Sequence, residues 1–428
     1  MGKRMVKCLV CGAIFEEGAE VCPVCGVGPE NFIPMEPEED EADSMDTDER
    51  FVILGTGTAA VSAATAIRKH NEDCDILMIS NERALPYNRP MLTKKMLHNN
   101  GREAFAIHTA EWYEQRHIRL MTNEIVSSLN PQLRQVTLSD DTVISYDKCI
   151  YALGARCFVP SFPGTHLPEV VTIRTLDDIE RVAKLTQAAS RAVVIGGGVL
   201  GLEAAWELKK AGLQVDVLEN AQRLLQRQLD EEASALLQRI ATDGGIAIHT
   251  MAATECVEGD EHVTGVRLKD GTTLPAQLVV ISTGVRPNIQ IAEQAGLSVQ
   301  RAVVVNAHME TSAPHVYACG DCAEFEGVNY SIWPEATRMG QVAGENAAGI
   351  STEYRNPLPA ITLNTMNTAL FAIGDMGTDP QKQYEVKRTY DAEQKTMQTE
   401  YRLDGKLVGG ILIGDTSGMQ KLMKEASA

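Results

Sequence analysis

The chain has 428 residues, which is enough for two or three domains that each bury a core of their own. Its formal net charge of −19, together with a run of nine acids and no base between Met35 and Glu49, argues against nucleic acids or anionic membranes as partners. No apolar run reaches the ~18 residues that a bilayer-spanning helix needs, and the first residues lack the apolar core of a secretory signal. We therefore expect a cytoplasmic protein.

Two CxxC pairs open the chain: Cys8 and Cys11, then Cys22 and Cys25. A glycine follows each pair, and the spacing lets two short loops present four thiolates to one metal ion. Four sulfur ligands suit either iron or zinc. The remaining cysteines are expected to be free thiols rather than disulfides.

Residues 5–35 resemble rubredoxins, because the second CxxC pair and the aromatic Phe32 that trails it match the C-terminal metal loop of that family. The resemblance implies a single iron ion that shuttles one electron. Only ten residues separate the two pairs, fewer than in a full rubredoxin, so a structural zinc ribbon is the alternative. We expect a metal domain at residues 1–34.

Residues 35–49 should form a solvated linker, because a run of like charges with Pro37 does not pack into a core. A domain held by such a linker meets nearby surfaces at an effective concentration on the order of millimolar. A simple spacer is the plainer interpretation of the same composition.

Beyond the linker, the chain contains one motif twice, each time as an apolar strand that runs into a glycine turn and then a helix. Two glycines two positions apart allow a tight turn and a close approach to a pyrophosphate, and a third small residue lets the helix pack on the strand. The helix N-terminus then directs free N–H groups at the phosphates. The residues are Gly55, Gly57 and Ala60 in the first copy and Gly196, Gly198 and Gly201 in the second.

The second strand of each copy should end in an acid that accepts the ribose hydroxyls. These acids are Glu82 and Glu219, and Glu219 lies 21 residues past Gly198. No arginine follows Glu219 until Arg223, so a 2′-phosphate would meet a carboxylate and NADH is favoured over NADPH. The alternative is that either acid merely ends a strand at the surface.

With these motifs and five further segments, residues 50–428 resemble the FAD- and NAD-dependent pyridine nucleotide-disulfide oxidoreductase family. The further segments, in the family's order, are Pro86–Lys94, Tyr151–Ala155, Ser282–Asn288, Tyr317–Asp321 and Trp333–Ala336. In this family the first glycine motif holds FAD and the second holds NADH. The resemblance places Arg89 and Lys94 along the FAD, Gly154 and Gly284 at the crossings between the domains, and Gly320 and Asp321 at the ribityl or pyrophosphate part of the FAD.

The resemblance implies an α/β fold with two doubly wound Rossmann-like domains of the glutathione reductase type. We expect the FAD domain at 50–158 and 286–350, the NAD domain at 159–285, and a small α+β C-terminal domain at 351–428. That last piece is short for the dimer-forming domain of disulfide reductases. Both a monomer and a homodimer therefore stay open.

The same resemblance implies three catalytic residues. Lys94 would lie near the reactive edge of the flavin and favour its negatively charged reduced form. Glu203 would lie near the nicotinamide and could pair with Lys94, unless it is a helix-surface acid stabilised by the helix dipole. Trp333 would lie near the flavin, either on the path by which electrons leave or as an apolar lid.

The CxxxxC dithiol of disulfide reductases is missing, since only Cys74 occurs between Ala60 and Cys149. Cys319 and Cys322 do form a CxxC, but within the FAD-aspartate motif, where two small buried residues are the ordinary interpretation. Without a thiol relay, one-electron iron–sulfur carriers are the natural acceptors of electrons from reduced FAD.

The whole chain thus resembles the NADH:rubredoxin oxidoreductases with a rubredoxin-like module attached. The acceptor would be the chain's own iron site, a separate rubredoxin-type or other iron protein, or both. One alternative is an NADH oxidase or a nitrite-reductase-like electron donor with a structural zinc site. Others are an NADH-redox-sensing interaction protein and a thiol-dependent reductase that works through Cys319 and Cys322.

Overall fold

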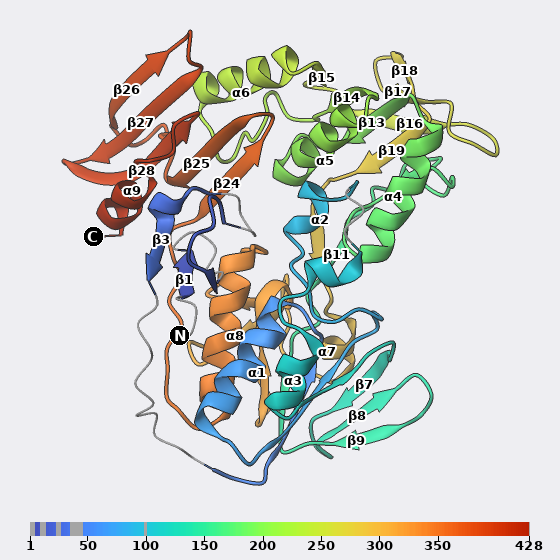
Figure 1. Ribbon diagram of the computed structural model, residues 1–428, viewed down its shortest axis with the longest axis vertical. Helices are drawn as coiled ribbons and strands as arrows, with labels where there is room; N and C mark the ends of the chain where they lie inside the picture. The colour runs from blue at the N-terminus through green and yellow to red at the C-terminus, as the bar shows by residue number, and fades with distance from the viewer. Residues whose placement is uncertain (1–4, 9–13, 23–26, 35–45, 98–100, 428) are drawn as a thin grey trace.

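The computed structural model describes residues 5–8, 14–22, 27–34, 46–97 and 101–427. Figure 1 shows a lower lobe that contains α1 and α8, an upper lobe that contains α4 and α5, and a third body formed by β24–β28 and α9. The first strands of the chain lie between that third body and the lower lobe. Among the described residues, no helix has both the length and the apolarity to cross a bilayer.

The lower lobe is built on a five-stranded parallel sheet of order β22-β10-β4-β5-β6. From the central strand β4 the chain winds first to one edge and then to the other, which is a doubly wound topology. Phe51, Val52, Ile53 and Leu54 are all buried, as a strand covered on both faces requires. The strands are β4 (Arg50–Leu54), β5 (Asp75–Ile79), β6 (Ile118–Met121), β10 (Lys148–Tyr151) and β22 (Val316–Ala318).

Two helices far apart in sequence, α1 (Thr58–His70) and α8 (Trp333–Ala347), lie side by side on this sheet. Glycines make the close contact possible. A Cβ atom at Gly340 would lie 2.2 Å from the carbonyl oxygen of Ala59, and one at Gly344 would lie 2.4 Å from that of Ala63. The two helices therefore touch backbone to backbone. The lobe is completed by α3 (Ala110–Gln115), α7 (Gln290–Gln294), and the strands β7 (Val126–Asn130), β8 (Gln135–Leu138) and β9 (Val143–Ser145).

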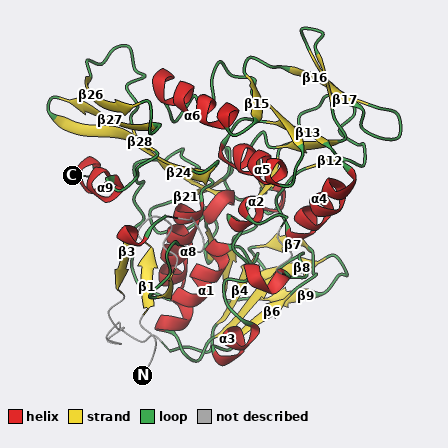
Figure 2. Cartoon of the chain, turned by 45° about the horizontal axis from the view of Figure 1, so that its top comes forward, coloured by secondary structure: helices red, strands yellow, loops and turns green. Residues whose placement is uncertain are grey.

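The upper lobe repeats the design with a parallel sheet of order β12-β19-β13-β14-β15. Its strands are β12 (Val170–Val171), β13 (Arg191–Ile195), β14 (Gln214–Leu218), β15 (Ile246–His249) and β19 (Leu278–Ile281). Its helices are α4 (Leu176–Ala188), α5 (Val199–Lys210) and α6 (Glu231–Asp243), and a small sheet holds β16 (Thr254–Glu258), β17 (Gly265–Leu268) and β18 (Thr273–Pro275). Figure 2 shows the helices of both lobes around their sheets.

The two lobes are joined by a pair of antiparallel strands, β11 (Ala155–Cys157) and β20 (Val285–Pro287). Ala155 pairs with Pro287 and Cys157 with Val285, so the outgoing and the returning chain run side by side. These are the two segments expected to cross between the domains. The domain boundaries themselves remain a prediction.

The third body is an antiparallel sheet of order β24-β25-β28-β27-β26, and α9 (Met419–Ala426) packs on β25 and β28. Its strands are β24 (Ala360–Thr365), β25 (Thr368–Gly374), β26 (Glu385–Asp391), β27 (Thr396–Leu403) and β28 (Lys406–Ile413). Arg388 and Tyr401 both donate to Asp230 at the N-terminus of α6. This α+β body is therefore held to the upper lobe.

At the other end of the chain, β1 (Met5–Cys8) pairs with β2 (Ile14–Glu16) and β3 (Phe32–Pro34) in a small antiparallel sheet. Cys8 and Cys22 are buried, and the ring of Phe15 meets that of Phe32 edge-on at 4.8 Å.

Candidate active site

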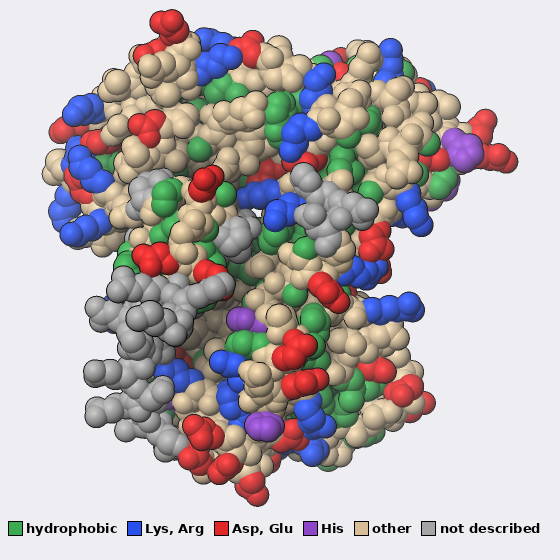
Figure 3. Space-filling model, in the orientation of Figure 1, with side chains coloured by type: hydrophobic (Ala, Val, Ile, Leu, Met, Phe, Trp, Pro, Cys, Tyr) green, Lys and Arg blue, Asp and Glu red, His purple; other side chains and the backbone are tan. Residues whose placement is uncertain are grey.

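A large cavity, of about 1540 Å³, lies where the lower lobe, the upper lobe and the C-terminal sheet meet. Drug-sized ligands occupy sites of roughly 300–1,000 Å³, so this cavity is large enough for a dinucleotide. Its walls come from the first glycine turn, the 89–94 segment, the first turn of α5, the start of α8 and strands β24 and β25. Figure 3 shows basic side chains at the waist of the molecule, where its upper and lower halves meet.

The first glycine turn forms the floor of the cavity. Gly55 has φ +115°, and a Cβ atom there would lie 2.3 Å from the carbonyl oxygen of Ala152, so only glycine fits. At Gly57, by contrast, a Cβ atom would meet nothing within 4 Å, which leaves the backbone open to a ligand. Ala60 is fully buried inside α1. This cradle fits the pyrophosphate of FAD at a helix N-terminus.

Glu82, the acid predicted to bind the ribose, forms a cluster with the nearby residues Tyr87 and Arg89. Its carboxylate pairs with the guanidinium of Arg89 and accepts a hydrogen bond of 2.6 Å from the Tyr87 hydroxyl. Arg89 also donates to the carbonyl oxygen of Arg174 at 2.7 Å. Burial alone would lower the pKa of Arg89, but the nearby oxygens of Tyr87 and Glu82 outweigh it and raise that pKa. The cation is thus firmly held beside the cavity.

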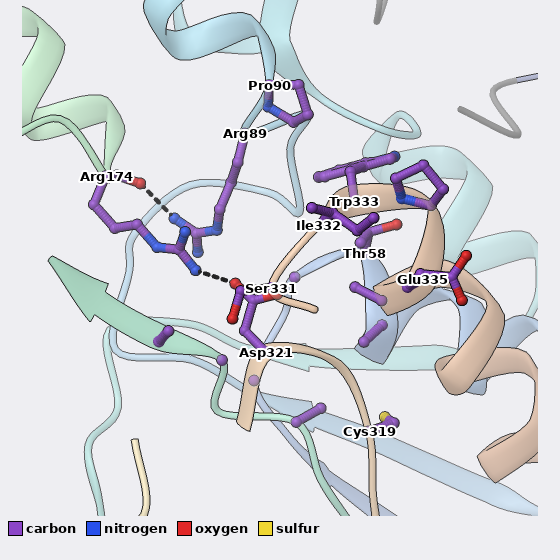
Figure 4. Close-up of a pocket in the computed structure, with 18 of the residues that line it drawn as sticks. Thr58, Arg89, Pro90, Arg174, Cys319, Asp321, Ser331, Ile332, Trp333 and Glu335 are labelled. Atoms are coloured by element: carbon purple, nitrogen blue, oxygen red, sulfur yellow. Dashed lines mark hydrogen bonds and ion pairs between the residues drawn. The ribbon is translucent and has the colours of Figure 1, made fainter. Parts of the chain in front are cut away.

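Arg174 is a cavity residue that the sequence did not reveal. Its guanidinium donates to the carboxylate of Asp321 at 2.8 Å, and Figure 4 shows the two side chains pointing toward each other at the pocket. Gly154 lies beside this pair, since a Cβ atom there would approach the Arg174 guanidinium at 3.8 Å. Gly320, with φ +75°, turns the chain just before Asp321. Arg174 stands in no glycine motif, and its partner is 147 residues away, so no local signal marked it.

Lys94 ends α2 (Met91–Lys94), a short helix that packs against α4 and α5, and it meets Glu203 of α5 inside the cavity. The Lys94 ammonium lies 3.6 Å from the Glu203 carboxylate, which also accepts a hydrogen bond from Thr93. Glu203 is only 3% exposed, which makes a helix-surface role untenable. Burial raises the pKa of Glu203 above its ordinary value, although Lys94 and Thr93 act to lower it. The catalytic roles of the pair stay predictions.

Trp333 opens α8 and lines the cavity together with Pro90 and Ile332, as Figure 4 shows. Its side chain is partly buried and packs against an apolar cluster of the C-terminal sheet. Both interpretations, an electron path and a lid, remain open at this position.

The second glycine turn is built like the first. Gly196 has φ +118°, and a Cβ atom there would lie 2.2 Å from the carbonyl oxygen of Ser282. A Cβ atom at Gly201 would lie 2.0 Å from the carbonyl oxygen of Gly196, so α5 packs tightly on its strand. Space is open around Gly198 and around Gly284.

Glu219 lies at this second turn and not among the residues that line the cavity. Its carboxylate accepts hydrogen bonds from the backbone N–H of Gly197 at 2.9 Å and of Ala221 at 2.8 Å. The acid is therefore oriented by local backbone alone. From the upper lobe, the first turn of α5 reaches the cavity through Val199, Leu200 and Glu203, beside the 172–175 loop.

The metal prediction is only partly covered by the structure, because Cys11 and Cys25 lie outside the described residues. Cys8 and Cys22 lie in one apolar cluster, and the backbone N–H of Cys22 donates to the carbonyl oxygen of Val27 at 2.8 Å. Within the part of the chain that the structure describes, no group of three or more His, Cys, Asp or Glu residues is arranged for a metal ion. Iron and zinc both stay predictions.

Cys319 and Cys322 are fully buried in the lower lobe, and Cys319 lines the cavity. Burial raises the pKa of Cys322 to about 12 and that of Cys319 well above its ordinary value. Because the thiolate is the reactive form, these thiols are poorly suited to redox exchange.

Comparisons with known proteins place this geometry in context. The profile of the Pyridine nucleotide-disulphide oxidoreductase family matches residues 49–340, and that of the Rubredoxin NAD+ reductase C-terminal domain matches residues 359–426. The chain is 32% identical to the NAD(P)H nitrite reductase of Bacillus subtilis over 87% of its own length and 46% of that protein. It spans about half the length of the first curated relatives it matches.

Two further similarities cover nearly the whole of the other protein. The chain is 30% identical to an NADH-rubredoxin oxidoreductase of Clostridium acetobutylicum, over 88% of this chain and 93% of that one. The crystal structure of an NADH:rubredoxin oxidoreductase from the same organism superposes with a TM-score of 0.75 at 30% identity, covering 89% of this chain and 95% of the other.

Proposed function

Because this chain belongs to the pyridine nucleotide-disulphide oxidoreductase family, we propose that it is an NADH-dependent FAD oxidoreductase that passes electrons singly to a rubredoxin-type iron centre. That centre is the chain's own N-terminal module, a separate rubredoxin-like protein, or both. The observation that carries the proposal is the C-terminal body, whose sequence matches the Rubredoxin NAD+ reductase C-terminal domain and whose strands wall the cavity.

The lower lobe offers the groups that FAD needs. Gly55 and Gly57 would cradle its pyrophosphate at the start of α1, while Glu82 and Arg89 lie beside the cavity for the ribose and phosphate groups. Asp321, held by Arg174, would bind the ribityl or pyrophosphate region. When bound, the flavin supplies the chemistry that converts hydride transfer into single-electron transfer.

The upper lobe offers a second glycine turn. Gly196 and Gly198 would receive the pyrophosphate of NADH while Gly201 keeps α5 close to its strand, and Glu219 would accept the hydroxyls of the adenosine ribose. The Lys94–Glu203 pair lies at the inner end of α5, toward the FAD side. There Lys94 would supply positive charge next to the reduced ring, and Glu203 would orient Lys94 through the ion pair.

An anaerobic titration with NADH tests the proposal. The absorbance of the flavin and of any iron–thiolate band is followed together, and we expect both to bleach. A Cys22→Ser variant should lose the metal and the thiolate band but keep flavin bleaching, whereas Cys256→Ser, in the upper lobe, should behave as wild type. If NADH fails to bleach the flavin in the wild type, the proposed activity is wrong.

The match to the nitrite reductase favours a second candidate, in which the same flavin unit feeds a different reductase and the N-terminal site holds structural zinc. Metal analysis of the purified chain separates the two. One zinc per chain, with NADH-driven reduction of other acceptors and none of rubredoxin, would favour this second function.

A further inference from the structure

The N-terminal module, defined as residues 5–34 where described, is not a free appendage. Its buried residues Cys8, Cys22 and Val27 belong to one apolar cluster with side chains of β25, β28 and α9, and its rings Phe15 and Phe32 pack against that cluster. Figures 1 and 2 both show β1 and β3 beside α8, with α9 near them. The module thus shares a core with the C-terminal sheet.

The same part of the C-terminal sheet is a wall of the flavin cavity. Six residues both line the cavity and take part in the apolar cluster: Trp333, Ala360, Phe371, Ile373, Met423 and Ala426. The module therefore packs in one cluster with residues that line this wall of the cavity, next to Trp333. Any protein that collects electrons by approaching this wall meets a surface that is already occupied.

The attachment of the module keeps it close to this surface. The chain is pinned again at Asp46 and Thr47: Asp46 accepts a hydrogen bond of 2.9 Å from the Glu72 N–H, and Thr47 accepts one of 2.8 Å from the Asn71 amide. Only residues 35–45 lie between the module and this anchor, and eleven residues span at most about 40 Å. Such a short connection gives an effective concentration on the order of millimolar.

We infer that the N-terminal module is the built-in occupant of a docking surface formed by β25, β28, α9 and Trp333, and that a separate rubredoxin-type acceptor competes with it there. The inference rests on the proposed function, because it takes the acceptor to approach the flavin from this side. If the module docks with an intrinsic dissociation constant of about 0.1 mM, the connection holds it in place roughly ten-elevenths of the time. The apparent KM for a separate acceptor is then raised about tenfold.

The docking is tested on the full chain by hydrogen exchange of the α9 amides. Ala426→Glu puts a charge into the shared cluster, and Lys421→Glu puts the same charge on the exposed face of the same helix. On the module, Val27→Glu and the control Val21→Glu make a second matched pair, because Val27 is 9% and Val21 54% exposed. We expect faster α9 exchange in Ala426→Glu and Val27→Glu only. Unchanged exchange in both overturns the inference.

The competition is tested with the module variants, which leave the docking surface itself intact. The probes are a purified one-iron rubredoxin and ferricyanide, a small acceptor that needs no docking surface. Val27→Glu should lower the KM for rubredoxin about tenfold and leave turnover with ferricyanide unchanged, and Val21→Glu should match wild type. A released module with an unchanged rubredoxin KM refutes the competition. If no variant reduces rubredoxin while α9 exchange still responds, the separate-acceptor part of the proposed function fails and the docking stands.

Discussion

The two Rossmann-like lobes carry the same glycine motif but hold their acids in opposite ways. In the upper lobe, Glu219 is oriented by two backbone N–H groups within its own turn. In the lower lobe, Glu82 is fixed by the side chains of Arg89 and Tyr87, and Arg89 is tied in turn to Arg174 in the other lobe. The lower site is thus built from segments that are distant in the sequence, which suits a cofactor that remains bound. The upper site is built from local backbone and is open, which suits a cofactor that binds and dissociates in each turnover.

The largest expected effect comes from the first glycine turn. Gly55→Ala should destabilise the lower lobe by more than about 3 kcal/mol, because φ +115° is strained for alanine and the new Cβ atom would overlap the Ala152 carbonyl. Gly57→Ala should keep the fold but lose FAD, since its Cβ atom points into open space. Thermal unfolding of the FAD-free protein and the flavin-to-protein absorbance ratio distinguish the two. Equal melting temperatures would contradict this account of the turn.

The contact between Lys94 and Glu203 is tested next. Glu203→Gln should slow flavin reduction by NADH about 100-fold in anaerobic stopped-flow measurements, because Lys94 loses its charged partner. The buried carboxylate has a raised pKa, so its stabilising contribution is complete below the unfolded value and is lost as pH rises through the folded one. The melting temperature of Glu203→Gln minus that of wild type should therefore increase as the pH is raised from about 5 to about 8. A constant difference in melting temperature would contradict the shifted pKa.

A smaller effect should follow in the upper turn. Glu219→Ala should raise the KM for NADH about tenfold through lost hydrogen bonds to the ribose, and should narrow the preference for NADH over NADPH. Glu219→Gln, which keeps the size but not the charge, should narrow that preference with a smaller change in KM. Steady-state rates with both nucleotides are the measurement. An unchanged preference for NADH over NADPH would mean that Glu219 does not contact the ribose.

The smallest effect is expected at a buried thiol of the lower lobe, Cys322. Cys322→Ser should change turnover by less than about twofold, because a buried thiol with a pKa of about 12 takes little part in exchange. The serine hydroxyl can still donate to the carbonyl oxygens of Tyr151 and Cys319, as the thiol does. A large loss of turnover would revive the thiol-dependent reductase.

Local sequence patterns predicted candidate site residues, whereas contacts between distant segments were not predictable from them. Both glycine turns and Glu82 were predicted from motifs within a short stretch of sequence, and Arg89 and Asp321 from the family resemblance. The meeting of Lys94 with Glu203 was expected from resemblance, but Arg174 was missed because its partner is far away in the chain. The burial of Cys8 and Cys22 against the C-terminal sheet was not predicted either. The composition of the linker indicates how far the module can extend, but not which surface it contacts.

The backbone contact between α1 and α8 has a mechanical consequence. At Gly340 and Gly344 no side chain separates the two backbones, and the hydroxyls of Thr58 and Thr337 lie 2.8 Å apart between the same helices. Such close packing leaves little room for one helix to slide along the other. One end of that pair carries the turn at Gly57, and its neighbour carries Trp333. The helix packing therefore fixes the spacing between the phosphate cradle and the tryptophan, and we expect relative motion of the two lobes at the β11–β20 strand pair that joins them.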